Sequence, residues 1–225
     1  MSLASYLNAF AARVHSARYH KCESLDVEAR KIARIAVQHV LHERRLESDI
    51  VFGVRHPLGF IRFPLTEPSP TLPRINLHLW LPERGTPYRE DIHDHCYDFF
   101  SFCIMGALQH ELFEISDRAD GFLVSTTQYG AGSCEDPSGT TGNLRVSPVG
   151  LFTVRALECY HFSHTWLHRA APCGNSAVSL QVQSPYVKQN ATVLRDAGGG
   201  EPSPTRQNIP NHLITEVLEA AVANI

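Results

Sequence analysis

From about residue 50 onward, the chain consists of short apolar segments that proline and glycine interrupt every few residues. The clearest of these segments are residues 59–63, 75–81, 99–105, 151–155 and 177–183. Short segments at close spacing, separated by turn residues, are typical of a β-sandwich or a β-barrel. We therefore expect this part of the chain to be mainly β, with antiparallel strands.

Both ends of the chain show a helical pattern instead. Ser24 can cap a helix, and apolar residues then recur at helical spacing, which predicts a helix at residues 25–42. A linker rich in glycine and proline at residues 198–204 precedes a second amphipathic stretch, which predicts a helix at residues 211–223. The expected division is a helical segment at residues 1–48, a β-domain at 49–195, and a linker with a helix at 196–225, all packed as one domain.

The composition restricts the classes of partner. The 225 residues carry a formal net charge of −3 and no block of lysine or arginine, so neither nucleic acid nor an anionic membrane is an expected partner. The apolar runs are shorter than the roughly 20 residues of a membrane span, and no basic leader is visible at the start. Six cysteines without a Cys-x-x-Cys pair indicate reduced thiols in the cytoplasm. We expect a cytoplasmic monomer or homodimer whose partner is a small-molecule substrate.

The chain contains 13 histidines, a high number that justifies a search for a metal site. His93 and His95 are two residues apart, so on a β-strand both imidazoles would face the same side. Two converging neutral imidazoles suit zinc, copper, iron or nickel better than calcium or magnesium. The alternative is a pair of surface histidines on an edge strand. The apolar run that follows stops at Gly106, and residues 107–115 resemble a partly buried strand, which predicts a hairpin turning at Gly106.

A second histidine-rich segment at residues 160–169 supplies candidates for a third metal ligand. They are His161, His164 and His168. The segment between the two histidine-rich stretches, residues 130–143, is polar and rich in glycine, which predicts a mobile loop that covers the mouth of the pocket. Further on, residues 188–194 are expected to add an edge strand.

A His-x-His pair, a glycine eleven residues later and a lone histidine some seventy residues on resemble the pattern of a cupin. The chain is most similar to the thiol dioxygenases, cysteine dioxygenase in particular, over roughly residues 75–185. That resemblance implies N-terminal helices followed by an antiparallel cupin barrel, a double-stranded β-helix, with iron held by three histidines. By this resemblance His168 joins His93 and His95 as the third ligand, and His164 is the alternative if the segment bends differently.

Several positions depart from the pattern of that family. Phe99 stands where cupins place an acidic fourth ligand. Asp98 lies one residue away and is an alternative ligand if the register shifts by one residue. Thiol dioxygenases carry serine, histidine and tyrosine at alternate positions of a late strand. The matching residues here are Ser179, Gln181 and Gln183, which are therefore the candidate catalytic residues. A thioether between cysteine and that tyrosine, known in some members, is excluded because Gln183 has no ring.

The residues and the resemblance together predict a mononuclear non-heme Fe(II) oxygenase with O₂ as co-substrate. Its substrate is expected to be a small molecule, with a thiol or an amino-acid derivative as candidates. Arg62 and Arg74 are the candidates for binding a substrate carboxylate, and Phe99 and Trp166 are expected to line the pocket. The alternatives are a non-redox lyase or isomerase that uses the metal as a Lewis acid, and a non-catalytic cupin that binds a ligand.

Overall fold

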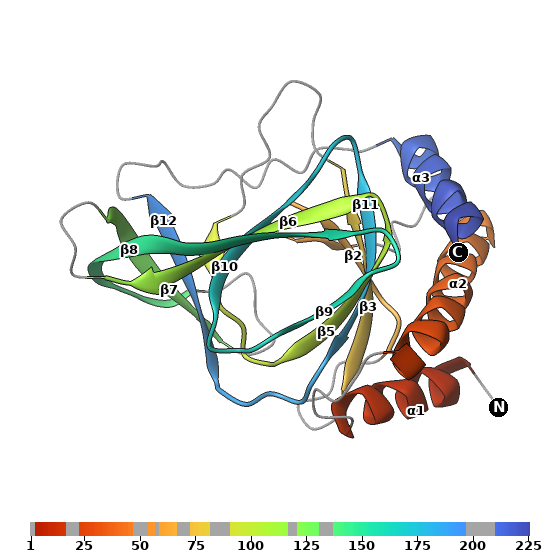
Figure 1. Ribbon diagram of the computed structural model, residues 1–225, viewed down its shortest axis with the longest axis horizontal. Helices are drawn as coiled ribbons and strands as arrows, with labels where there is room; N and C mark the ends of the chain where they lie inside the picture. Colours follow the sequence, from red (N-terminus) through yellow and green to blue (C-terminus); the bar gives the residue numbers. More distant parts are fainter. Residues whose placement is uncertain are drawn as a thin grey trace.

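The computed structural model describes residues 3–16, 23–46, 54–56, 59–66, 73–81, 91–116, 121–130, 137–196 and 210–225. These ranges contain three helices, α1 (Leu3–Ser16), α2 (Glu23–Leu46) and α3 (Asn211–Asn224), and Figure 1 shows all three on the same side of the β-structure. The helices predicted from the sequence lie within α2 and α3, so both helices are confirmed. Ser24, which was expected to cap the first of them, instead lies inside α2, because that helix already begins at Glu23. Among the helices described, none combines the length and the apolar character needed to cross a membrane.

The described strands form two antiparallel sheets (Figure 1). The first sheet contains, in spatial order, β1 (Val54–Arg55), β2 (Ile61–Pro64), β3 (Arg74–Trp80), β11 (Ala177–Gln183), β5 (Phe99–Met105) and β9 (Cys159–Phe162). The second contains β10 (Leu167–Pro172), β4 (Ile92–His93), β12 (Asn190–Asp196), β7 (Phe122–Gly130), β8 (Pro137–Arg155) and β6 (Ala107–Ile115). In addition, β6 pairs with β10, the strand at the other end of that order. The expected mainly β, antiparallel class is therefore confirmed.

One face of the first sheet packs against the helices. Val178, Leu180 and Val182 alternate along β11 and belong to one buried cluster with Ile32 of α2 and Leu218 of α3. Because successive side chains of a strand point to opposite faces, these three residues face the helices together. Full burial of each such side chain stabilises the fold by about 1.5–3 kcal/mol, so this interface holds the helices to the sheet.

The opposite face of the same strand is polar but equally buried. Ser179, Gln181 and Gln183 are only 1%, 5% and 3% exposed. Phe99 of β5 pairs with Gln183 and therefore shares its face, and the Phe99 ring lies 6.4 Å from the ring of His168 on β10 of the second sheet. The second sheet thus covers this polar face, and the interior between the sheets holds a set of hydrogen-bonding groups that an ordinary apolar core lacks.

The hairpin predicted at Gly106 is wrong, although the strand boundaries on either side are correct. Strand β5 pairs with β11 and β9, whereas β6 pairs with β8 and β10, so the chain changes sheets at Gly106. Gly106 has a φ of 76°, and a Cβ atom there would overlap the carbonyl oxygen of Ser176. A close approach of two backbones at a corner, and not a tight turn between paired strands, is what requires glycine here.

Two segments take a different place in the sheets from the one that the sequence predicted. Residues 137–143 were expected to belong to a mobile loop, but they form the start of β8, and Thr140 and Thr141 pair with Thr127 and Thr126 of β7. Backbone hydrogen bonds of the ladder hold this segment without an apolar side-chain pattern, which is why the pattern missed it. Residues 131–136 of the expected loop lie outside the described residues. The strand expected at residues 188–194 is present as β12, but it is not an edge strand, because it pairs with both β4 and β7.

Candidate metal centre

Three histidines meet at one point between the sheets. His93, His95 and His168 each offer one ring nitrogen, and these nitrogens all lie within 4.8 Å of one another. Nε2 of His95 lies 2.9 Å from Nε2 of His168. Within the described part of the chain, no carboxylate and no cysteine joins this group. The structure therefore brings together the three residues that the sequence selected as ligands.

Strand pairing places two of the three rings. His93 of β4 stands opposite His168 of β10 in the ladder between those strands, and their ring centroids are 4.5 Å apart. Strand β4 ends at His93, so the alternation expected from the sequence does not position His95. The His95 ring is held instead by Tyr97 at 5.1 Å and by the edge-on Phe99 at 5.0 Å, measured between centroids. Aromatic packing, and not strand geometry, turns His95 toward its partners.

Hydrogen bonds orient His93 and occupy the nearby acids. Nδ1 of His93 donates to the carbonyl oxygen of Asp91 at 2.9 Å, which leaves the lone pair of Nε2 for a metal. The carboxylate of Asp91 accepts from Nε of Arg195 at 2.8 Å. Asp94, between the two histidines, forms an ion pair with Lys188 at 2.6 Å. The acidic side chains closest in sequence are thus bound to cations.

His164 and Asp98, the two alternative ligands that the sequence left open, contact each other in the structure. Oδ1 of Asp98 accepts hydrogen bonds from the backbone nitrogen and from Nδ1 of His164, both at 2.7 Å. Burial by itself raises the pKa of the Asp98 carboxyl, but these bonds from His164 outweigh it and lower the pKa overall. Neither residue belongs to the histidine cluster. The pair joins the segment after β4 to the turn before β10, and so helps to align the two ligand-bearing stretches.

Burial keeps the clustered imidazoles neutral. Loss of solvent lowers the pKa of His93, of His95 and of His168, and the proximity of His93 lowers the pKa of the other two further. An imidazole binds a metal through a lone pair, which protonation would remove. The environment of the cluster therefore favours the ligand form of all three rings near neutral pH.

The candidate catalytic residues line the wall next to this cluster. Nε2 of Gln183 donates to Oε1 of Gln181 at 2.7 Å, and Oγ of Ser179 accepts from Nε1 of Trp80 at 3.5 Å. Phe99 links the wall to the metal centre, because it pairs with Gln183 and packs on His95. The glutamine side chains do not face solvent. They present amide groups to the interior.

The residues expected to line the pocket occupy different depths. Phe99 is 3% exposed, whereas Trp166 is 44% exposed. The Trp166 ring lies edge-on to Phe162 at 5.2 Å, and Phe162 packs on His168 at 4.2 Å. Trp166 thus supports the wall from outside, one ring removed from the cluster. The two arginines, Arg62 of β2 and Arg74 of β3, lie in the first sheet.

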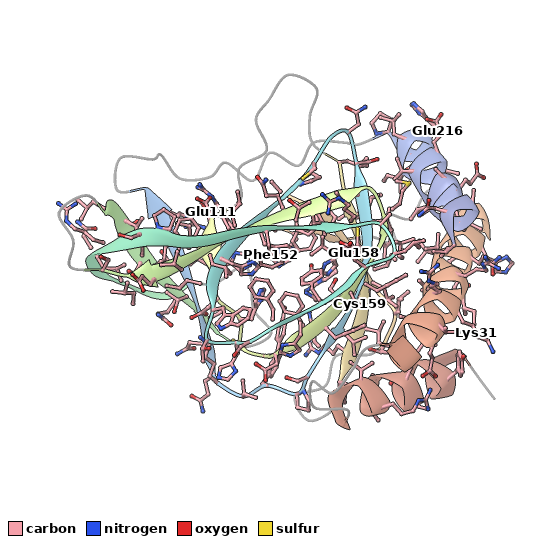
Figure 2. The ribbon with its side chains drawn as sticks, viewed as in Figure 1. Lys31, Glu111, Phe152, Glu158, Cys159 and Glu216 are labelled. Atoms are coloured by element: carbon pink, nitrogen blue, oxygen red, sulfur yellow. The ribbon has the colours of Figure 1, made fainter. Side chains whose placement is uncertain are left out.

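One further histidine near the cluster escaped the sequence analysis. His110 of β6 is 1% exposed, and neither of its ring nitrogens has a hydrogen-bond partner in the described structure. Its ring stacks on the ring of Phe152 with a centroid distance of 5.0 Å, and its centroid lies 5.6 Å from that of His168. Phe152 is labelled in Figure 2. The sequence did contain a signal for the burial of His110. It lies two residues after Leu108 in a segment with a strand-like pattern, so both side chains are expected on the same buried face.

Comparisons with known proteins do not assign a family. No protein-family model matches the chain, and neither does a curated protein. One solved structure, described as crystal structures of the DMSP lyases RdDddP and RnDddQII, is 11% identical over 56% of this chain and 47% of that chain, with a TM-score of 0.31. A hypothetical protein from Leishmania major is 13% identical over 63% of this chain and 78% of that chain, with a TM-score of 0.35. The chain thus spans about half the length of the first of these, and both likenesses are too low to support a function.

His78 makes the folding stability depend on pH. Burial, followed by the nearby Arg62 guanidinium, lowers the pKa of His78 to about 3, whereas an unfolded histidine titrates near 6.5. Below about pH 6.5 the unfolded chain binds a proton that the folded chain does not, so the stability falls as the pH decreases, by up to about 1.4 kcal/mol per pH unit for this residue. We expect His78→Leu to flatten the pH dependence of the unfolding free energy, measured with urea between about pH 4.5 and 7. The exposed His42→Leu variant is the control, and an unchanged slope in His78→Leu would contradict the expectation.

Proposed function

We propose that this chain is a metal-dependent enzyme with a cupin-type barrel, and that it is a mononuclear non-heme Fe(II) oxygenase acting on a small molecule. The observation that carries the proposal is the convergence of three neutral imidazoles, from the buried His93 and His168 and the half-buried His95. They lie beside a wall of uncharged hydrogen-bonding groups, Ser179, Gln181 and Gln183. The sequence resemblance to the three-histidine cupins selects the same three residues. A thiol or an amino-acid derivative is the proposed substrate class.

The donor set fits a transition metal with open positions. Three imidazoles and no carboxylate suit iron, copper, nickel or zinc. The 2.9 Å contact between Nε2 of His95 and Nε2 of His168 brings two nitrogens of the same kind face to face. This separation suits an ordinary hydrogen bond between two neutral rings. It equally suits two nitrogens bound at about 2 Å and at a right angle to one metal ion. The carbonyl of Asp91 already sets His93 in the matching tautomer.

A bound Fe(II) would supply electrons for the reduction of O₂ and positions at which substrate and O₂ can both bind. The residues of the chain hold and shield that site. Phe99 and Phe162 pack on the ligand rings and keep water from that side of the cluster. The bond between Gln183 and Gln181 fixes both amides, so that the remaining amide N–H groups of Gln181 can donate to a bound substrate. Ser179, which accepts from Trp80, keeps its own hydroxyl proton available for donation.

Metal analysis followed by oxygen-uptake measurements tests the proposal. The purified protein is expected to bind close to one Fe(II) per chain and to consume O₂ with at least one member of a panel of small thiols, carboxylates and amino-acid derivatives. A variant with all three ligands changed to alanine serves as the control. Turnover without O₂ uptake would replace the oxygenase by a lyase or isomerase. A metal-loaded protein that converts no member of the panel would favour a non-catalytic binding protein, and failure to bind metal would overturn the whole proposal.

A further inference from the structure

The interior face of the first sheet carries positive charge and no acidic side chain. Strands β2, β3, β5, β9 and β11 contain neither aspartate nor glutamate. Arg62 stands opposite His78 in the ladder between β2 and β3, and Arg74 lies four residues before His78 on β3. Even spacing on a strand keeps side chains on one face, and His78 and Arg74 pair with Ser179 and Gln183 of the interior wall. Both arginines therefore belong to the face that looks toward the metal centre.

Neither arginine is neutralised within the described residues. The Nε atoms of Arg62 and Arg74 are buried and have no hydrogen-bond partner, and no described carboxylate forms an ion pair with either side chain. Arg169 and Arg195, by contrast, donate through Nε to Glu111 and Asp91 at 2.7 and 2.8 Å. The guanidinium of Arg74 lies 5.0 Å from the centre of the Tyr186 ring, but a ring face does not cancel a charge. A buried donor without a hydrogen-bond partner on a charged group costs free energy. An anion bound to the guanidinium would remove that cost.

A third unsatisfied group lies beside Arg62. His78 is 5% exposed, and its Nε2 has no hydrogen-bond partner in the described structure. Phe60 packs on the ring at 4.5 Å, and Trp80 lies edge-on to it at 6.4 Å, so aromatic contacts hold the ring in place. Burial and the charge of Arg62 favour the neutral imidazole, which can donate one hydrogen bond. Arg62 and His78 together thus offer donors for one acid group.

The metal centre adds to this charge if the proposed function is correct. Three neutral imidazoles leave the charge of a divalent cation intact, because no carboxylate belongs to the cluster in the described residues. With only the described residues as possible partners, a substrate with a single acid group would leave one of the two guanidinium groups uncompensated. The backbone positions of Arg62 and Arg74 are also separated by four residues along the sheet, roughly 13 Å, which favours one acid group per arginine over one group shared by both.

We propose that the substrate of this site carries two acid groups, one bound by Arg62 together with His78 and the other by Arg74. The chemical class is a small, flexible dicarboxylate or a similar diacid, with its metal-binding atom between the two ends. This inference rests on the proposed function for the role of the ligand as a substrate. The two-acid pocket itself depends only on residues of the first sheet.

Calorimetric binding of acids that differ only in the second acid group tests the inference. Succinate, glutarate and adipate are compared with butyrate, pentanoate and hexanoate on metal-free and on Fe(II)-loaded protein. At least one diacid is expected to bind about tenfold more tightly than the monoacid of equal length. Arg62→Met and Arg74→Met should each abolish that advantage, and His78→Phe should reduce it. Arg34→Met, which changes an exposed arginine of α2, should leave it unchanged.

The outcomes separate this inference from the proposed function. Equal affinity for monoacids and diacids in the wild-type protein would overturn the inference, and so would an undiminished advantage in Arg74→Met. The wild-type comparison of diacids with monoacids tests the inference even if a methionine variant fails to fold. In that case Arg62→Gln and Arg74→Gln, which also remove the charge, replace those variants with the same expected loss of the advantage. A diacid advantage in metal-free protein that binds no Fe(II) would support the two-acid pocket while overturning the oxygenase.

Discussion

His168→Ala is expected to lower the metal affinity of the protein by more than about 100-fold and to abolish turnover. Loss of groups that merely support a ligand costs roughly 10- to 100-fold, so loss of a ligand should exceed that range. His168 is 3% exposed, and its Nε2 lies 2.9 Å from Nε2 of His95. A side chain at the protein surface therefore cannot easily reach this position and take over as the third metal ligand. Metal content after dialysis against limiting Fe(II), measured by plasma emission spectrometry, gives the result directly.

Two neighbouring histidines are the matched controls for that variant. His164→Ala should keep its metal, because its Nδ1 is bonded to Asp98 and its ring lies outside the cluster. His161→Ala should keep its metal as well, since His161 lies opposite Phe100, a residue of the helix-facing core. Loss of metal in His164→Ala together with retention in His168→Ala would show that the third ligand has been assigned to the wrong histidine.

Gly106→Ala is expected to destabilise the protein by about 3 kcal/mol or more. A residue with a side chain loses roughly 1–2 kcal/mol in the left-handed conformation that a φ of 76° requires. The new Cβ atom would also overlap the carbonyl oxygen of Ser176 and lie 3.1 Å from Cα of Ala177, which costs roughly 1–3 kcal/mol more because both are backbone atoms. The midpoint and slope of urea unfolding measure the loss.

Gly174→Ala separates these two contributions. Gly174 also has a positive φ, of 101°, but a Cβ atom there would meet nothing within 4 Å. This variant should therefore lose only the conformational part, about 1–2 kcal/mol. If Gly106→Ala is no less stable than Gly174→Ala, the close contact between the corner at Gly106 and the start of β11 does not hold in solution.

Local pattern predicted the positions of several strands and of two helices. Short apolar segments between prolines and glycines predicted β3, β5 and β11, and helical periodicity predicted α2 and α3, because these signals depend on nearest neighbours in the chain. What the pattern missed was the pairing. Strands β5 and β6 looked like a hairpin but belong to different sheets, and residues 137–143 joined β8 through backbone hydrogen bonds that leave no trace in side-chain type.

The amino-acid sequence by itself determined the chemistry available to the candidate site. The sequence alone shows three histidines at His93, His95 and His168, no acid at Phe99, and two glutamines in the segment that forms β11. Only the tertiary structure decided which residues meet. His164 and His168 follow His95 by 69 and 73 residues, so their separations along the chain hardly distinguish them. His164 is nevertheless hydrogen-bonded to the carboxylate of Asp98 and lies outside the cluster.

The unpartnered groups of Arg62, Arg74 and His78 were equally invisible in the sequence. Whether a charged or polar side chain finds a partner depends on what packs across from it, and those neighbours lie on strands far apart along the chain. Residue type is set locally, whereas burial and hydrogen-bond satisfaction are set by the whole fold. For that reason the sequence could predict a metal site, but only the assembled sheets reveal the charge that a substrate would have to match.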